Sequence, residues 1–235
     1  LLPAGGPVST RVVGKVTPER AEQADRVKEF MNYQITEVMQ EYDPELDQML
    51  FYLPLSGSSF KKVYYDENLN RAVAKFISSE HLVVPYETTD LKSATRITHV
   101  IQMNTNDVRK LQQSGFYRDV ELIPGPLPDS PVTEKIDRLE GVEQTRYMTP
   151  DVMAILECHA FLDLEGFGDL DEEGEATGIQ FPYIVTFEES TSQILSIRRN
   201  WEEEDPLKER KQYFVHYKFL PGLGFYGFGL IHMIG

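Results

Sequence analysis

Apolar residues recur at three- and four-residue spacings near the start of the chain. This pattern predicts one amphipathic helix over residues 18–41. Thr17 is a suitable N-cap residue, and Pro18 stands at the first helical position, where proline is favoured. The apolar stripe consists of Ala24, Val27, Phe30, Met31, Ile35, Val38 and Met39.

Two shorter segments flank this helix. A strand is predicted over residues 11–16. A second helix is predicted over residues 43–53, because an Asp-Pro pair repeats the cap signal and apolar residues continue at helical spacing. Pro54 and Gly57 are expected to end it.

Alternating apolar and polar residues then predict strands. Residues 60–65 and 72–77 flank a turn at 66–70, which predicts a hairpin. A short buried piece at 82–85 and a strand over 96–103 follow.

A short helix and a proline-rich stretch come next. Asn104 or Thr105 caps the helix, and Ser114-Gly115 closes it with glycine in the usual C-terminal position. Residues 121–146 begin with several prolines and are expected to form a linker and a short helix.

Four more strands are predicted in the second half of the chain. They cover residues 154–164, 183–188, 194–201 and 212–219, and a turn at 190–193 makes the middle two a hairpin. Their spacing predicts one antiparallel sheet. The fold class is therefore α+β: helices and hairpins first, then an antiparallel sheet.

The expected organisation has four parts. They are an N-terminal α+β part at 1–120, the linker at 121–146, the antiparallel section at 147–220, and a junction with the start of a helix at 221–235.

The composition indicates a folded, acidic protein. The chain has 235 residues, 41% hydrophobic and 26% charged, and a formal net charge of −15. Such a chain should not bind nucleic-acid phosphates over a broad surface, because the affinity for phosphates comes from Lys and Arg. Much of the charge falls between Arg146 and Arg198, where eleven acidic residues and no basic ones stand.

No catalytic pattern emerges. Cys158 is the single cysteine, so no disulfide can form within the chain, and a small buried residue is the expected role. Ser56 to Ser59 lack the Gly-x-Ser-x-Gly nucleophile elbow. The histidines show no metal-ligand spacing; they are His81, His99, His159, His216 and His232. The chain is not expected to be an enzyme.

One glycine-rich segment is similar to the dinucleotide-binding fingerprint. Gly222-x-Gly224-x-x-Gly227 has the required spacing, but the site needs a strand, a phosphate-facing helix and a second strand. The strands before it are predicted antiparallel, so no cofactor is expected there. A nucleotide-dependent enzyme domain using this turn stays an alternative.

Residues 169–177 are similar in pattern to the first half of a calcium-binding loop. Asp169, Asp171 and Glu173 place oxygen donors at alternate positions, followed by glycine at the sixth position and Thr177 at the ninth. The twelfth position is Gln180 instead of a bidentate Glu. A solvated acidic loop is the expected structure, and a calcium-binding enzyme domain is kept as an alternative.

Basic residues form two candidate clusters. Solvated strand faces and salt-bridged loops explain both more simply than nucleic-acid contact does. The first cluster is Lys61, Lys62, Arg71 and Lys75; the second is Arg198, Arg199, Lys208, Arg210 and Lys211.

Several sequence segments, which we call phrases, resemble segments of the portal proteins of tailed bacteriophages, especially those of short-tailed phages. They occur in matching order over most of the chain. The longest are Leu53 to Asp66 (LPLSGSSFKKVYYD) and His216 to Gly229 (HYKFLPGLGFYGFG). The shorter ones are Phe30 to Tyr33, Val83 to Tyr86, Thr89 to Leu91, Arg96 to Val100 and Gly115 to Asp119.

The resemblance implies a structural role without enzymatic activity. Portal proteins form rings, usually of twelve identical subunits, at one capsid vertex of the virion, and are assembled in the host cytoplasm. Double-stranded DNA passes through the channel during packaging and ejection, without sequence-specific binding. Terminase, tail or neck adaptor proteins, and capsid and scaffold proteins are the further partners; no membrane is involved.

By the same resemblance the chain corresponds to the α+β wing, with the glycine-rich phrase preceding the first stem helix. Since the first residue is not Met and an apolar helix begins near Leu230, the chain is expected to be part of a longer protein. The glycines Gly222, Gly224 and Gly227 are expected to form a structural junction. Phe225, Tyr226 and Phe228 are expected to pack there against protein.

Overall fold

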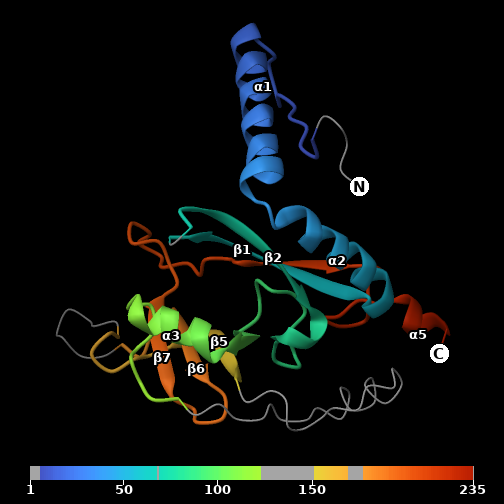
Figure 1. Ribbon diagram of the computed structural model, residues 1–235. Helices are drawn as coiled ribbons and strands as arrows, with labels where there is room; N and C mark the ends of the chain where they lie inside the picture. Colours follow the sequence, from blue (N-terminus) through green and yellow to red (C-terminus); the bar gives the residue numbers. More distant parts are fainter. Residues whose placement is uncertain (1–5, 68, 123–150, 169–176, 235) are drawn as a thin grey trace. The chain divides into compact units, whose positions relative to one another are not determined.

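The computed structural model describes residues 6–67, 69–122, 151–168 and 177–234 (Figure 1). The chain forms two units that interleave along the sequence. Unit 1 comprises Leu1–Glu80, Thr89–Lys92 and Gln212–Gly235, and unit 2 comprises His81–Thr88 and Ser93–Lys211. Each unit holds one antiparallel sheet together with helices, so the predicted α+β class is confirmed. The expected N-terminal part, 1–120, is divided between the two units.

Unit 1 opens with helix α1 (Pro18–Tyr33). The hydroxyl of Thr17 accepts a hydrogen bond from the backbone N–H of Arg20 at 3.3 Å, as expected of an N-cap residue. The helix continues as the π-helical turn η1 (Gln34–Val38). The helix predicted over 18–41 is thus confirmed as far as Val38, with its last turn in π geometry.

The strand predicted over 11–16 is wrong. No strand forms there, and the backbone in and before this segment is bonded to α1 instead: the Arg20 guanidinium donates to the carbonyl of Lys15 at 3.3 Å. The Asn32 amide donates to the carbonyl of Val8 at 3.0 Å and accepts from its N–H at 2.9 Å. The Thr10 hydroxyl donates to the carbonyl of Ala24 at 2.7 Å. Helix side chains and carbonyls therefore take the place of a partner strand.

Helix α2 (Tyr42–Ser56) packs on the first two strands of unit 1. Pro54 lies inside it, so the prediction that this proline ends the helix is wrong. So close to the C-terminal end, proline leaves only one helical carbonyl without its amide partner. Gly57 ends the helix, with φ of +85°, in the left-handed region that favours glycine.

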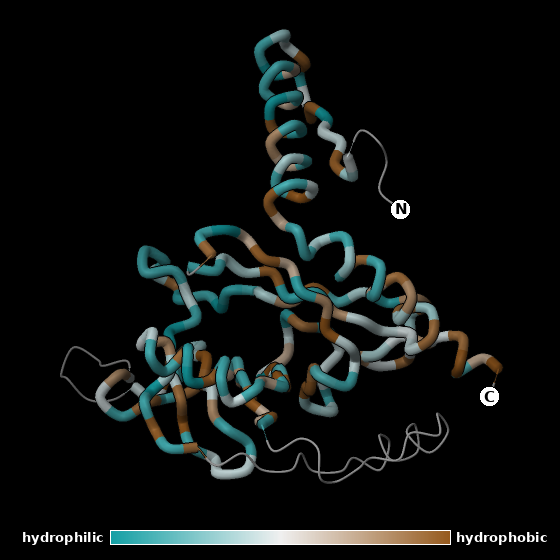
Figure 2. Tube along the Cα trace, in the orientation of Figure 1, coloured by the Kyte–Doolittle hydropathy of each residue, from teal (hydrophilic) through white to brown (hydrophobic). Residues whose placement is uncertain are grey.

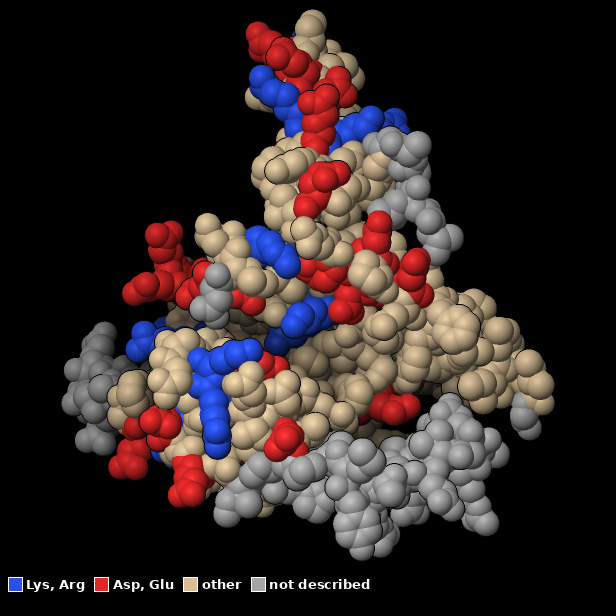
Figure 3. Space-filling view, viewed as in Figure 1, with Lys and Arg blue, Asp and Glu red and all other residues tan. Residues whose placement is uncertain are grey.

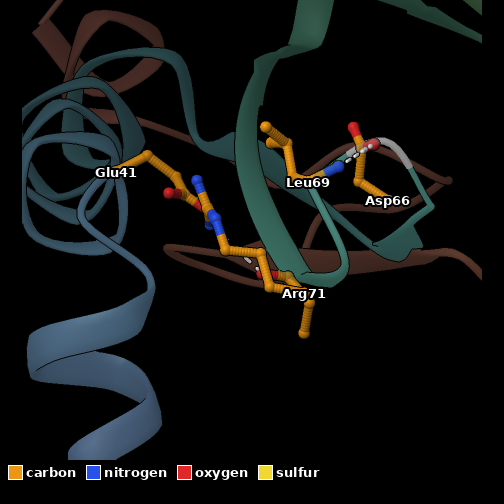
Figure 4. A network of polar contacts seen from close by, with 5 residues as sticks. Glu41, Asp66, Leu69 and Arg71 are labelled. Atoms are coloured by element: carbon orange, nitrogen blue, oxygen red, sulfur yellow. Dashed lines mark hydrogen bonds and ion pairs between the residues drawn. The ribbon is translucent and has the colours of Figure 1, made fainter.

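The sheet of unit 1 has the order β2-β1-β8. Strands β1 (Ser58–Asp66) and β2 (Arg71–Ser78) form the predicted hairpin, with Phe60 opposite Ile77. The Asp66 carboxylate accepts from the N–H of Leu69 at 3.1 Å within the turn (Figure 4). Strand β8 (Phe214–Lys218) pairs with the other edge of β1.

The sheet of unit 2 has the order β3-β4-β5-β6-β7. The strands are β3 (Leu82–Val83), β4 (Arg96–Asn104), β5 (Val152–Leu162), β6 (Phe181–Glu188) and β7 (Ile194–Arg199), and β3 follows a short 3-10 turn, η2 (Ser79–His81). These bounds confirm the strands predicted over 96–103, 154–164, 183–188 and 194–201.

Helix α3 (Thr105–Gln113) covers part of this sheet. Its N-cap is Asn104, whose side-chain oxygen accepts from the N–H of Asp107 at 2.8 Å. The core beneath it joins residues from the helix, the following loop and the strands. Its buried members are Val108, Tyr117, Met153, Ile155 and Leu195.

The strand predicted over 212–219 exists as β8, but its predicted partners are wrong. It was expected beside the three preceding strands, yet it pairs with β1 in unit 1. The outer edge of β7 is met instead by the segment after α3, where the N–H of Arg118 donates to the carbonyl of Leu195 at 2.7 Å. Periodicity alone specifies a strand and not its neighbour.

The surface of unit 1 combines charge with apolar groups. Acidic and basic side chains are interspersed along α1 (Figure 3). Apolar side chains stay exposed on α2 and on the short helix α5 (Leu230–Ile234), among them Phe51, Ile231 and Ile234. The hydropathy colouring shows that α5 is mostly apolar (Figure 2). Among the described residues, none of the helices has the length and apolar character needed to cross a bilayer. The expected linker at 121–146 falls outside the description from residue 123 onward.

Candidate functional site

The glycine-rich phrase after β8 folds back onto the start of β1. The N–H of Phe219 donates to the carbonyl of Gly57 at 3.0 Å. Leu220 and Phe228 then form an isolated antiparallel bridge, with N···O distances of 3.3 and 2.9 Å, which closes residues 220–228 into a loop. We call this loop, together with Gly57, Ser58 and Phe60, the junction.

Close approach of backbones explains most of its glycines. A β-carbon on Gly227 would lie 2.5 Å from the carbonyl oxygen of Gly57 and 2.6 Å from that of Leu220. A β-carbon on Gly229 would collide with the carbonyl of Leu55, and one on Gly222 with the carbonyl of Tyr226. Real side chains essentially never show such contacts. These glycines allow one segment to pass against another.

Gly224 differs from its neighbours. No atom lies within 4 Å of the position its β-carbon would take, and its φ is not in the left-handed region. Gly57, on the other side of the contact, combines a positive φ with backbone neighbours at Gly227 and Gly229. The spacing of Gly222, Gly224 and Gly227 thus reflects packing at two positions and coincidence at the third.

A stack of rings fills the junction. Phe60 is fully buried, and its ring lies 4.4 Å from the imidazole of His216 and 5.8 Å from the ring of Phe225. Tyr226 meets Phe60 edge-on at 6.4 Å. Phe225 is buried, whereas Tyr226 and Phe228 each keep about two fifths of their surface exposed. Only one of the three aromatic residues of the phrase is therefore fully enclosed.

A serine and a histidine join the junction by hydrogen bonds. The Ser58 hydroxyl lies 3.1 Å from Nε2 of His216 and accepts from the N–H of Gly227 at 2.8 Å. Burial, with a smaller contribution from Lys218, lowers the pKa of His216 to about 4. The imidazole is therefore neutral near pH 7, and its tautomer decides which of the two groups donates in the bond to Ser58.

This pair resembles a nucleophile and its base, but its surroundings give it a structural role. Ser58 is only 1% exposed, and its oxygen already accepts an amide N–H. A nucleophile must instead present its oxygen to a substrate. Sequence reasoning missed the pair, because 158 residues separate its members.

Three successive amide groups at the end of the loop are already bonded to protein. The N–H groups of Gly227, Phe228 and Gly229 donate to Ser58 Oγ, the carbonyl of Leu220 and Nδ1 of His232. A phosphate cradle requires such N–H groups to face the ligand. The strand before the loop, β8, pairs antiparallel with β1, unlike the strand of a dinucleotide site.

The calcium-loop candidates Asp169, Asp171 and Glu173 lie outside the described residues. Thr177 is described, and its hydroxyl accepts from the N–H of Ile179 at 3.3 Å. Over residues 6–67, 69–122, 151–168 and 177–234, no group of three or more His, Cys, Asp or Glu side chains is placed to hold a metal ion.

The first basic cluster is taken up by contacts within unit 1. Lys61 is nearly buried, with its ammonium 4.2 Å from the centre of the Tyr42 ring. Lys62 lies over Tyr64. The guanidinium of Arg71 donates to the carboxylate of Glu41 at 2.7 Å (Figure 4). These contacts occupy three of the four cations of the cluster; the fourth, Lys75, is exposed on β2.

Unit 2 contains a buried polar cluster that the sequence did not reveal. His159 is 2% exposed, and its Nε2 lies 2.8 Å from the carboxylate of Glu157. The amide of Asn200 approaches the other ring nitrogen at 3.4 Å. Burial, and then the charge of Glu157, raise the pKa of Tyr117 to about 12. Both nitrogens of His159 thus face protein groups, which suits a structural role.

One sequence feature could have indicated this cluster: the i, i+2 spacing of Glu157 and His159, which places both on one face of a strand. Their partner Asn200 comes from beyond β7, far along the chain.

No protein-family model matches the sequence, and a search of curated proteins yields no significant match.

Proposed function

We propose that this chain is part of a structural subunit of a tailed-bacteriophage portal. The ring of twelve identical subunits would conduct double-stranded DNA during packaging and ejection. Terminase and the tail or neck proteins would attach to it, and capsid and scaffold proteins would surround it at the portal vertex of the virion. The role is one of assembly and requires no catalysis.

One structural observation carries the proposal. The two longest phrases that resemble portal proteins, 53–66 and 216–229, lie far apart in the sequence but form one packed unit. Strand β1 from the first phrase pairs with β8, and Phe60 stacks on His216 and Phe225 of the second. A resemblance due to chance would not be expected to select two segments that depend on each other structurally.

The chemistry of the junction also favours a structural role. The amides of Gly227 and Gly229, the Ser58 hydroxyl and the His216 imidazole all bond to other parts of unit 1. The dinucleotide alternative gains no support from the described residues, because the glycine turn packs against its own chain. The calcium alternative stays untested, because Asp169, Asp171 and Glu173 lie outside the described residues.

The acidic composition is compatible with DNA passage. A channel wall that lets DNA slide must not bind phosphates tightly, and a net charge of −15 satisfies this condition. Many acidic proteins share this property, so it accompanies the proposal and does not carry it.

Electron microscopy of the full-length protein tests the proposal. We expect closed rings with a central channel over a range of protein concentrations. Light scattering coupled to gel filtration should give a mass near twelve times that of the subunit. A monodisperse monomer in all conditions, with an intact fold by circular dichroism, would overturn it.

A matched pair of variants separates ring formation from folding. Phe51→Ser removes an exposed ring on α2, and Leu223→Ser removes a fully exposed side chain of the junction loop. Neither change opens a buried core, so the monomer should stay folded. Loss of rings in one variant with an unchanged melting temperature would locate a subunit contact, and rings in both would place the contacts elsewhere.

A further inference from the structure

A groove of about 750 Å³ in unit 2 brings together rings and cations. Strand β6, the end of β7 and the loops beside them line it. The rings on its wall are Phe167, Phe181, Tyr183 and Trp201, and the cations are Arg199, Lys208 and Lys211. Its size lies within the range of small-ligand sites in proteins.

The loop that follows β7 holds two of the cations in place. The Asp205 carboxylate accepts from the N–H groups of Leu207 and Glu209 at 3.0 and 2.7 Å. The N–H of Lys211 donates to the carbonyl of Asn200 at 3.0 Å, which fixes the end of the loop. The cations are thus positioned before any ligand arrives, which lowers the entropy lost on binding.

Lys208 adopts an unusual backbone conformation in this loop. Its φ is +50°, in the left-handed region that lysine rarely occupies, and its ammonium lies 3.8 Å from the centre of the Phe181 ring. Arg199 lies 5.8 Å from the centre of the Trp201 ring. Strained residues that persist in a fold cluster at ligand sites, so Lys208 points to a function for this groove.

Only some members of the second basic cluster predicted from the sequence line this groove. Arg199, Lys208 and Lys211 line it, while Arg198 stacks on Phe116 and Arg210 donates to the carbonyl of Ala94. Two carboxylates also line the groove: Glu202, which pairs with Lys211 at 2.9 Å, and Glu203. Among the described residues, three cations and two carboxylates therefore line the groove.

We infer that this groove binds a nucleoside phosphate, either as a free mononucleotide or within an unpaired nucleic-acid strand. The base would stack on Trp201 and Phe181, and the phosphate would accept charge-assisted hydrogen bonds from Arg199 and Lys208. Rings backed by cations suit this combination of a planar apolar group and an anion. The inference stands on unit 2 alone and does not depend on the proposed portal role.

Trp201 is the single tryptophan of the chain, so tryptophan fluorescence reports directly on the groove. The full chain is titrated with thymidine monophosphate, a short oligothymidylate, thymidine, inorganic phosphate and an oligoglutamate. We expect saturable quenching by the first two ligands and at least tenfold weaker binding of the other three. The melting temperature should rise with the same two ligands.

Variants link the signal to the groove. Arg199→Gln and Lys208→Gln should each weaken thymidine monophosphate binding about tenfold, as loss of a charge-assisted hydrogen bond does. Phe181→Leu should weaken nucleotide binding while leaving that of phosphate unchanged. Lys110→Gln on α3, which removes the same charge from an exposed position outside the groove, should leave affinity unchanged.

The two sources of the ligand differ in salt dependence. A strand site binds oligothymidylate more tightly than the mononucleotide, with an affinity that falls steeply with salt. A mononucleotide site binds both alike, and either result supports the inference. Equal quenching by oligoglutamate or by phosphate alone would overturn it in favour of a general anion site. So would the absence of both quenching and thermal stabilisation at millimolar nucleotide.

Discussion

Ser58 and His216 are 158 residues apart in the chain and are joined by a hydrogen bond of 3.1 Å at the junction. The bond links β1 to β8, and the same hydroxyl accepts the N–H of Gly227 from the loop beyond. One buried side chain therefore connects three segments. The stability of unit 1 should depend strongly on it.

Ser58→Ala leaves the buried N–H of Gly227 and the half-buried Nε2 of His216 without their partner. Each unsatisfied buried group costs about 1–3 kcal/mol, so the free energy of unfolding should fall by about 2 kcal/mol or more. Urea denaturation measures this change. Ser59→Ala is the matched control, because Ser59 is equally buried and its hydroxyl has no hydrogen-bond partner. Its effect should stay within about 0.5 kcal/mol.

Gly227→Ala should destabilise unit 1 by about 1–3 kcal/mol, because the new methyl group meets the carbonyls of Gly57 and Leu220. Gly224→Ala should change stability by less than about 0.5 kcal/mol, since its methyl group enters open space. Thermal unfolding of the two variants, side by side, checks the difference. Equal effects would mean that the loop does not pack closely against Gly57.

Local features of the fold could be predicted from sequence, and long-range ones could not. The β1–β2 hairpin follows from alternating residues around a short turn, and the cap of α1 follows from Thr17 and Pro18. Both depend on neighbours in sequence. The pairing of β8 with β1 depends instead on the fit of Phe60 against His216, which no periodicity encodes.

The candidate sites show the same limit. The glycine phrase was recognisable, but its spacing suggested a phosphate, while the structural reason is the passage of Gly227 and Gly229 against Gly57. That reason requires knowing which segment lies opposite. The groove cations were visible as a basic run, yet only the fold separates Lys208 and Arg199 from Arg198.

His216 makes stability depend on pH. Its pKa is lowered from 6.5 to about 4, so between these values the unfolded chain binds a proton that the folded chain does not. The contribution of the neutral His216 ring to the free energy of unfolding is complete above pH 6.5, and it is lost as pH falls to about 4. Since the ring is partly solvent-accessible, the loss should be on the order of 2 kcal/mol.

The variant His216→Gln isolates this effect from the many carboxylates that also titrate. Its unfolding free energy should be lower than that of the parent at pH 7, and the difference should shrink as pH approaches 4. Denaturation curves at several pH values give the comparison. A constant difference between the two proteins over this range contradicts the lowered pKa.

Glu188 organises the turn between β6 and β7. Its carboxylate accepts from the N–H and hydroxyl of Ser190 and of Thr191, at 2.6 to 3.0 Å. Burial alone would raise its pKa, but these bonds outweigh it and lower the pKa. Glu188→Gln should cost about 1–3 kcal/mol at neutral pH, and less in acid. Glu189→Gln, an exposed neighbour, should be nearly neutral; hydrogen exchange of the turn amides separates the two.

Glu41 and Arg71 join α2 to β2 through a contact of 2.7 Å, with about a quarter of each side chain exposed (Figure 4). Burial acts to raise the pKa of Glu41, but the bond to Arg71, the charge of Arg71 and backbone hydrogen bonds together lower it. A double-mutant cycle with Glu41→Gln and Arg71→Gln should therefore show a coupling that persists at high salt. The exposed pair Glu22 and Arg26 on α1 provides the control. Its coupling should be roughly twofold smaller or less, and salt should abolish it. Equal couplings would mean that Arg71 contributes only as a surface charge.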